Sequence, residues 1–571
     1  MKFFTILIAI CLLPSLAPGQ VLGTPKPKLD ISFNRYYTHK EIGELLQKFK
    51  KTWPEFVEVE SIGKSFQGRE MWLLTLQNKQ TGGEFDKAAM YIDANIHGNE
   101  IQGAEVCLYT IWYLLENYGK IERVTKLVDQ RVFYIAPTVN PDGRDYWLAK
   151  ANTSSSSRSG QRPIDSDRDG LFDEDPPNDL DNDGNITRMR KKVEKNGTHK
   201  IDPDDPRFLV RVKPGKTGPY ILLGSEGIDD DGDGRLNEDG PGGYDMNRNN
   251  PADWQPNYVQ RGAGPYPFSE PEVRSIGTFF YAHPNIASVQ SYHNAGGMIL
   301  RGPGADYVPD YPRADLRVYD AIGKDGAKIL PFYRYMILYK DLYTVHGGFV
   351  NFAAETLGII SFTNELWSES QRFQSADRDR SDRVKFNDLV MMGSLYHDWK
   401  PFKHPVYGDI EIGGWTKESS RVNPRFMLEE TCHRNAVFTL NQAEHMPTIE
   451  MTAEVIPGPT PATTTVRVVL ENKELIPSRT ALAAQKKIGL PDFLAIRSMS
   501  QADVVAASEL SGPSHNEKRR AIIKDMSRLR LESGVGSKAK RTFEWILTGR
   551  GPFVISYKSE KGGKKDITLR Y

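Results

Sequence analysis

Apolar runs alternate with helical periodicities along the first two thirds of the chain. The segment 39–53 has apolar residues at helical spacing, and Thr38 followed by Glu41 forms the pattern of an N-terminal capping box. Residues 58–78 read as two strands around a turn at Gln67-Gly68, and Ala88 to Ile92 reads as a buried strand. Helical spacing then returns from Ile101 to about Leu115. Helices alternating with buried strands predict an α/β fold, with helices packed on both faces of a sheet.

The same alternation continues further along the chain. Residues 130–143 predict a strand ending in the turn Asn140-Pro141-Asp142-Gly143, and residues 285–300 predict two more strands. The segment 382–399 predicts a closing helix of this first domain. We therefore expect the α/β domain to span residues 20–400.

The pattern changes character after about residue 400. Residues 401–445 are expected to form a connector, and from residue 446 onward short alternating runs are separated by turn residues. Such runs are typical of two packed antiparallel sheets. We expect a β-sandwich domain over residues 446–571.

The N-terminus has the features of an export signal. Lys2 is followed by an apolar run from Phe3 to Leu13 and then by small residues, which predicts a signal peptide over residues 1–19. That run is too short to span a bilayer, and no later apolar run reaches 18 residues. Cys107 and Cys432 are expected to be free thiols rather than a disulfide framework. The mature protein is therefore expected to be secreted or periplasmic, without a membrane span.

Overall charge does not favour a polyanionic partner. Lys and Arg total 74, as do Asp and Glu, so no global field attracts nucleic acid or an anionic membrane.

A histidine and a carboxylate lie three residues apart where the strand at 88–92 gives way to a helix. A histidine near a helix start is often only hydrogen-bonded, and a glutamate there suits the helix dipole. His97 and Glu100 can also face one point, and imidazole and carboxylate are both good zinc ligands. Deciding between these interpretations requires a third ligand and a catalytic group elsewhere in the chain.

Three further residues supply that set. His293 ends a predicted strand before a glycine-rich turn, Glu365 follows an apolar run, and Tyr343 lies 22 residues before Glu365. With the segments 140–143, 188–191, 244–249 and 269–273, this order resembles the zinc carboxypeptidases of the carboxypeptidase A/B type over about residues 36–400. "HGNE" at 97–100 is more similar to the regulatory branch of that family, which also carries a small β-sandwich after the catalytic domain.

The resemblance implies a role for each residue. His97, Glu100 and His293 would hold one catalytic Zn²⁺, and Glu365 would act as general base. Arg190 would stabilise the oxyanion of the tetrahedral intermediate, with Arg188 as an alternative. The resemblance further implies that the substrate would be gripped at its terminal carboxylate by Asn247 and Arg248, covered by Tyr343, and selected by Val350.

Val350 sits seven residues after Tyr343, where relatives that prefer basic ends place an acidic or polar residue. A valine offers no partner to a buried Lys or Arg. We therefore expect a preference for neutral or apolar C-terminal residues.

Two aspartate-rich insertions, 163–185 and 227–241, depart from the family pattern. They contain the repeat D-x-D-x-D-G three times, at Asp165, Asp167 and Asp169, at Asp179, Asp181 and Asp183, and at Asp229, Asp231 and Asp233. Alternating aspartates before a glycine can aim several oxygens at Ca²⁺, although each repeat lacks the EF-hand glutamate at position 12. We expect calcium in at least one cluster, and the alternative is a solvated acidic loop.

The function expected from the sequence is an exported zinc metallocarboxypeptidase acting on the C-termini of peptides or proteins. One alternative is a cell-wall (peptidoglycan) peptide hydrolase of the same fold. A second alternative, of a different class, is an inactive, calcium-stabilised binding module. Activity on a peptidoglycan stem peptide but not on ordinary peptides would favour the cell-wall hydrolase.

Overall fold

A computed structural model describes residues 26–166, 168–377, 379, 381–499, 502–512, 518–548 and 551–570. The predicted signal peptide and Asp167 lie outside these residues. Among the described residues, no helix combines the length and apolar character needed to cross a bilayer.

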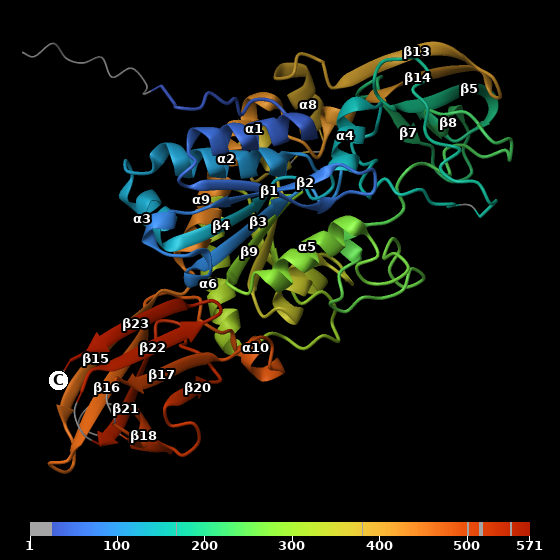
Figure 1. Ribbon diagram of the computed structural model, residues 1–571. Coiled ribbons are helices and arrows are strands. Elements are labelled where there is room, and N and C mark those ends of the chain that lie inside the picture. Colours follow the sequence, from blue (N-terminus) through green and yellow to red (C-terminus); the bar gives the residue numbers. More distant parts are fainter. Residues whose placement is uncertain are drawn as a thin grey trace, which may run out of the picture.

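An eight-stranded mixed sheet forms the centre of the first domain (Figure 1). In spatial order its strands are β1 (Val57–Lys64), β2 (Glu70–Leu76), β4 (Arg131–Ala136), β3 (Ala88–Ala94), β9 (Ile286–Asn294), β12 (Ile360–Leu366), β10 (Met298–Arg301) and β11 (Arg334–Ile337). Strands β4, β3, β9 and β12 are mutually parallel, so their carboxyl ends meet at one edge.

Helices cover both faces of this sheet. The helices of the first domain are α1 (His39–Thr52), α2 (Gln102–Asn117), α3 (Glu122–Gln130), α4 (Pro141–Ala149), α5 (Pro271–Ala282), α6 (Arg313–Ile329), α7 (Phe349–Asn351), α8 (Asp382–Leu389) and α9 (Leu428–Glu444). On β3, Met90 and Ile92 pack into one core with α1, α2 and α9, whereas Ala89 and Tyr91 pack into a second core with α5. The predicted α/β fold is confirmed, as is the capping box between Thr38 and Glu41.

Two segments differ from the prediction. Helix α8 ends at Leu389, because the chain turns through Gly393 at positive φ and then enters a strand. The helix that closes the first domain is α9, within the segment 401–445 that we expected to be a connector. Cys432, Ala436 and Phe438 of α9 are fully buried in the main core, so this segment belongs to the domain.

A second, six-stranded sheet projects from the first domain. Its spatial order is β13 (Tyr396–His404), β14 (Gly408–Trp415), β5 (Arg188–Gly197), β8 (Gly218–Ser225), β6 (His199–Ile201) and β7 (Leu209–Arg211). Figure 1 shows this accessory sheet and the neighbouring aspartate-rich loops apart from the main sheet.

The C-terminal region forms the predicted β-sandwich. One sheet contains β15 (Ile449–Pro457), β16 (Thr463–Asn472), β21 (Lys540–Thr548), β18 (Val504–Ser511) and β19 (Lys518–Ile522). The other contains β20 (Arg528–Leu531), β17 (Asp492–Ser498), β22 (Phe553–Ser559) and β23 (Gly563–Leu569), and the short helix α10 (Ala481–Lys486) lies beside them. Both sheets contribute to one core that includes Trp545 and Tyr557.

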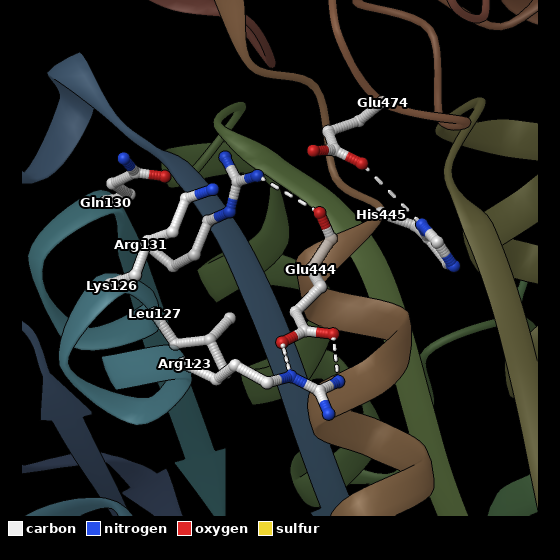
Figure 2. A pocket seen from close by; sticks show the side chains of 8 residues that line it. All are labelled: Arg123, Lys126, Leu127, Gln130, Arg131, Glu444, His445 and Glu474. Carbon is white, nitrogen blue, oxygen red and sulfur yellow. Dashed lines mark hydrogen bonds and ion pairs between the residues drawn. The ribbon is translucent and has the colours of Figure 1, made fainter. Parts of the chain in front are cut away.

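The end of α9 joins the two domains (Figure 2). Arg131 of β4 is buried and donates hydrogen bonds to the carbonyls of Met446 (2.7 Å) and Pro447 (2.9 Å). Figure 2 shows Arg123 of α3 facing the carboxylate of Glu444, which it contacts through Nε and Nη2. Because these arginines bind the residues at the C-terminal end of α9, they fix the position at which the β-sandwich begins.

Candidate functional site

The turn between β3 and α2 carries His97 and Glu100 at the carboxyl edge of the main sheet. Asn95 adopts a left-handed conformation (φ 60°), and its side-chain amide donates to the carbonyl of His97 at 2.6 Å. Gly98 is required because a Cβ there would lie 2.5 Å from the carbonyl oxygen of Ser157. Helix α2 begins at Gln102, so both side chains precede it rather than lie in its first turn.

His293, near the end of β9, completes a compact buried cluster. Its Nδ1 lies 2.8 Å from Oε2 of Glu100, and Nδ1 of His97 lies 3.0 Å from the same oxygen. One ligand atom from each of the three side chains lies within 4.8 Å of the others. Two imidazoles and one carboxylate that converge in this way match the ligand set of a catalytic zinc.

Asp245 and Arg158 surround this cluster and were missed by the sequence analysis. Asp245 Oδ1 lies 3.1 Å from Nε2 of His97, the arrangement by which a carboxylate orients a metal-binding imidazole. Arg158 contacts Glu100 through Nη1 at 3.0 Å and Asp245 through Nε at 3.1 Å. The available signal for Asp245 was its place two residues before Asn247.

The charges of these groups are mutually stabilised. Burial alone raises the pKa of Asp245, but His97, Arg248 and Arg158 together hold it well below its usual range. Burial lowers the pKa of the Arg158 guanidinium, but the neighbouring carboxylates of Asp245 and Glu100 raise it by more. The net shift of the pKa is therefore upward. The site therefore contains a fixed cation beside the ligand cluster.

Glu365 lies on β12 directly beside His293 of β9 in the parallel register. Burial raises the pKa of its carboxyl group to about 7, and neighbouring Glu100 adds to the rise. The two strands thus place a second carboxylate next to the ligand cluster.

Of the residues expected to bind a terminal carboxylate, Asn247 contacts His293 directly. Asn247 Nδ2 lies 3.4 Å from Nε2 of His293, while its Oδ1 accepts a hydrogen bond from the backbone of Phe349. Arg248 is buried, and its Nη1 donates to the carbonyl of Asn247 at 2.8 Å. Tyr343 is half exposed, which leaves its ring accessible.

Val350 of α7 is buried in a small apolar cluster. Its other buried members are Met298, Leu300, Met336, Leu338 and Val345. Asp306, in the loop that follows Leu300, is solvent-exposed.

Arg190 lies elsewhere, which corrects our expectation for the oxyanion arginine. It sits on β5 of the accessory sheet, where its Nε contacts Glu411 at 2.7 Å. Its guanidinium stacks on the rings of Trp399 and Tyr220. Arg188, the alternative, pairs through its backbone with β8 and β14 and is exposed. Arg158, from a serine-rich loop, reaches Glu100 of the ligand cluster at 3.0 Å, and Arg421 reaches the same carboxylate at 3.5 Å.

The aspartate repeats fold into tight loops that largely satisfy their own backbone. Asp165, Asp179 and Asp229 each accept backbone N–H groups from residues three to five positions later. The structure groups further carboxylates with them. The resulting clusters are Asp169, Glu174 and Asp231; Asp175, Asp231 and Glu238; Asp179, Asp181 and Glu226; and Asp229, Asp231 and Asp233. Asp183 instead contacts His397.

Comparison with known proteins agrees with this geometry. The zinc carboxypeptidase family matches residues 42–194 and 224–383, which is more than half of the chain. The chain belongs to the zinc carboxypeptidase family. The gap in the match, 195–223, falls within the accessory sheet, and a family of domains of unknown function matches residues 451–570.

Individual relatives of this zinc carboxypeptidase family member match over shorter stretches. Carboxypeptidase D of Rattus norvegicus is 33% identical over 140 residues, which cover 24% of this chain and 10% of that protein. A zinc carboxypeptidase of Saccharothrix mutabilis subsp. capreolus is 32% identical over 117 residues, covering 20% and 27%. The crystal structure of thrombin activatable fibrinolysis inhibitor aligns at 19% identity and a TM-score of 0.45, covering 74% of this chain and 77% of that one.

Proposed function

We propose that this protein is an exported zinc carboxypeptidase that removes C-terminal residues from peptides or proteins. The observation that carries the proposal is the buried convergence of His97, Glu100 and His293 beside Glu365. Asp245 fits the same function, because a carboxylate behind a ligating histidine fixes its ring and raises its basicity. Export rests on the sequence of residues 1–19, which the structure does not describe.

The three ligands suit one zinc ion. When bound, zinc would activate water and polarise the scissile carbonyl. Glu365 takes a proton from the attacking water and delivers one to the leaving amine, a role worth roughly 10²–10⁴-fold. Arg158 donates hydrogen bonds to the oxygen that becomes negative, and its contacts with Glu100 and Asp245 hold it in place beforehand.

Recognition of a chain end requires a cation at a fixed distance from the scissile bond. Arg248 supplies that cation, since a planar guanidinium can bind both oxygens of a carboxylate. Asn247 adds a second donor, and the half-exposed Tyr343 covers the terminal residue. The side chain of that residue enters the apolar cluster around Val350, which favours neutral or apolar ends.

In this proposal zinc is the catalytic cofactor, and Ca²⁺ in the aspartate-rich insertions is a second, structural one.

The test is a peptide-library digest by the full chain, before and after zinc removal and after zinc is restored. We expect C-terminal residues to be released singly, with activity lost and regained in step with zinc content. Glu365→Gln should retain zinc and lose at least about 100-fold in turnover. Glu60→Gln, an exposed glutamate on β1, makes the same chemical change elsewhere and should behave as wild type. Near-normal turnover by Glu365→Gln would remove the basis for the assigned base.

A further inference from the structure

The two aspartate-rich insertions meet at one surface although more than 40 residues separate them. Asp175 and Asp239 pair as an antiparallel bridge, and Asp175 Oδ2 accepts the backbone N–H of Asn237 at 2.8 Å. Asn178 binds the second insertion twice, through the N–H of Ile228 and the carboxylate of Asp230. The two insertions therefore form one folded unit.

Carboxylates from both insertions crowd together at this junction. Asp169 and Glu174 of the first converge with Asp231 of the second, and Asp175 of the first converges with Asp231 and Glu238. Within each trio one oxygen per residue lies within 4.8 Å of the others. Like charges at this spacing repel one another strongly unless a cation lies between them.

Asp239 provides an independent indication of a missing cation. Its side chain is fully buried, and no donor among the described residues reaches either carboxylate oxygen. Its recorded side-chain neighbour is the carboxylate of Glu174, which itself has a buried oxygen without a donor. Burying an unpaired carboxylate costs free energy, so a solvated acidic loop does not explain the position of Asp239.

A second carboxylate cluster lies at the base of the accessory sheet. Asp179 and Asp181 lie just before β5, and Glu226 follows β8, so the three carboxylates converge where the two strands pair. Glu226 is fully buried, and Oδ1 of Asp181 is buried without a donor. Burial raises the pKa of Glu226 to about 7, and Asp181 adds to the rise despite hydrogen bonds from Thr187.

Glutamates from outside the repeats can replace the ligand that each repeat lacks at position 12. Glu174, Glu226 and Glu238 come from outside the D-x-D-x-D segments, and the fold brings each one to an aspartate cluster. A loop that lacks its own closing glutamate can therefore receive one from another part of the chain.

We propose that the two insertions bind Ca²⁺ in two places. One lies between the insertions, with Asp169, Glu174, Asp175, Asp231, Glu238 and Asp239, and the other is formed by Asp179, Asp181 and Glu226. The clusters offer only oxygen ligands, which suit hard cations, and flexible multi-carboxylate loops suit Ca²⁺ better than the strictly octahedral Mg²⁺. Segments 165–183 and 226–239 contain sixteen acidic residues and two arginines, so the excess negative charge is large.

The first site also lies close in the chain to the catalytic groups. The excursion leaves the first domain after Arg158 and returns at Asp245, and Gly160 N–H donates to the carbonyl of Tyr244 at 3.0 Å. A cation that fixes the two insertions therefore also holds the paired residues Gly160 and Tyr244, which lie next to Arg158 and Asp245 in the chain. Calcium binding itself does not depend on the catalytic proposal.

The test uses the full chain freed of divalent ions, with one equivalent of zinc restored, and titrated with CaCl₂ in a calorimeter. We expect at least two bound Ca²⁺ and a melting temperature raised by about 3 °C or more. MgCl₂ at the same concentration should reproduce less than half of that shift. Absence of binding heat, or an equal shift with Mg²⁺, would overturn the proposal.

Neutralising variants give a sharper test. Asp239→Asn should raise the melting temperature of the calcium-free protein, because it removes a buried unpaired charge. Glu226→Gln should also raise it, because it removes one of three converging negative charges. Each should also lower the affinity of one Ca²⁺ by at least about tenfold. Asp204→Asn, an exposed aspartate in the same excursion, is the matched control and should change neither. If Asp239→Asn and Glu226→Gln destabilise both forms equally, the carboxylates are structural and the proposal is wrong.

Discussion

Arg158 and Arg190 offer the most direct test of how the site is assembled. The contacts of Arg158 with Glu100 and Asp245 use its Nε and Nη1 groups, so Nη2 is left to donate to a substrate oxygen. Removing one such donor typically costs 10²–10³-fold in kcat, or about 2.7–4 kcal/mol. We therefore expect Arg158→Met to lose about 100- to 1,000-fold in kcat.

The same substitution also removes a contact to the ligand Glu100. Loss of such an outer contact typically weakens metal binding by 10–100-fold, so the assay must contain saturating zinc. The measurement is kcat and KM on a short peptide with a C-terminal leucine, with zinc content determined for each variant. Arg158→Lys keeps the charge but not the planar fork, and it should recover only part of the loss.

Arg190→Met is the matched control. Its guanidinium lies 4.2 Å from the ring of Trp399 and 4.8 Å from that of Tyr220, and its Nε contacts Glu411. Removal should lower the melting temperature, while kcat stays within about twofold of wild type, because the described contacts of Arg190 belong to the accessory sheet. A large kcat loss in Arg190→Met together with normal turnover in Arg158→Met would refute the placement of Arg158.

Three further outcomes follow from the packing. Val350→Asp should lower kcat/KM for peptides with a C-terminal leucine at least about tenfold and raise the relative rate for matched peptides ending in arginine. The reason is that a buried carboxylate is costly unless a cationic side chain pairs with it. Burial raises the pKa of Glu272 to about 7 in the folded state from about 4.5, so its contribution to stability falls as pH rises across that window. Urea unfolding at pH 4 and pH 8 should therefore show Glu272→Gln gaining up to about 3 kcal/mol relative to wild type at the higher pH, and an unchanged difference would contradict the burial argument. Arg131→Met should lower the unfolding free energy by about 2–4 kcal/mol, because the carbonyls of Met446 and Pro447 lose their donor, and a neutral result would show that water replaces it.

The sequence predicted the features that neighbouring residues encode. The capping box of Thr38 and Glu41, the buried strand β3 and the turn carrying His97 and Glu100 each depend on a few adjacent side chains, so periodicity and local chemistry indicate them. The resemblance to the zinc carboxypeptidases added His293, which no local pattern distinguishes from a structural histidine. The placement of α9 could not be read in the same way, because whether a helix is a connector or part of a core depends on what it packs against.

Only the tertiary structure decided which distant groups meet. Arg158 and Asp245 are 87 residues apart, and the excursion between them brings its ends together through contacts that have no signature in either segment. Position in the chain suggested Arg190, but the twist and pairing of β5 turn that side chain toward Trp399. Glu226 likewise reaches Asp179 and Asp181 because β5 and β8 pair. Neighbouring residues determine the local backbone conformation and its periodicity. Contacts between distant residues close long loops, and they form only when the packing of the whole chain offsets the entropy cost of that closure.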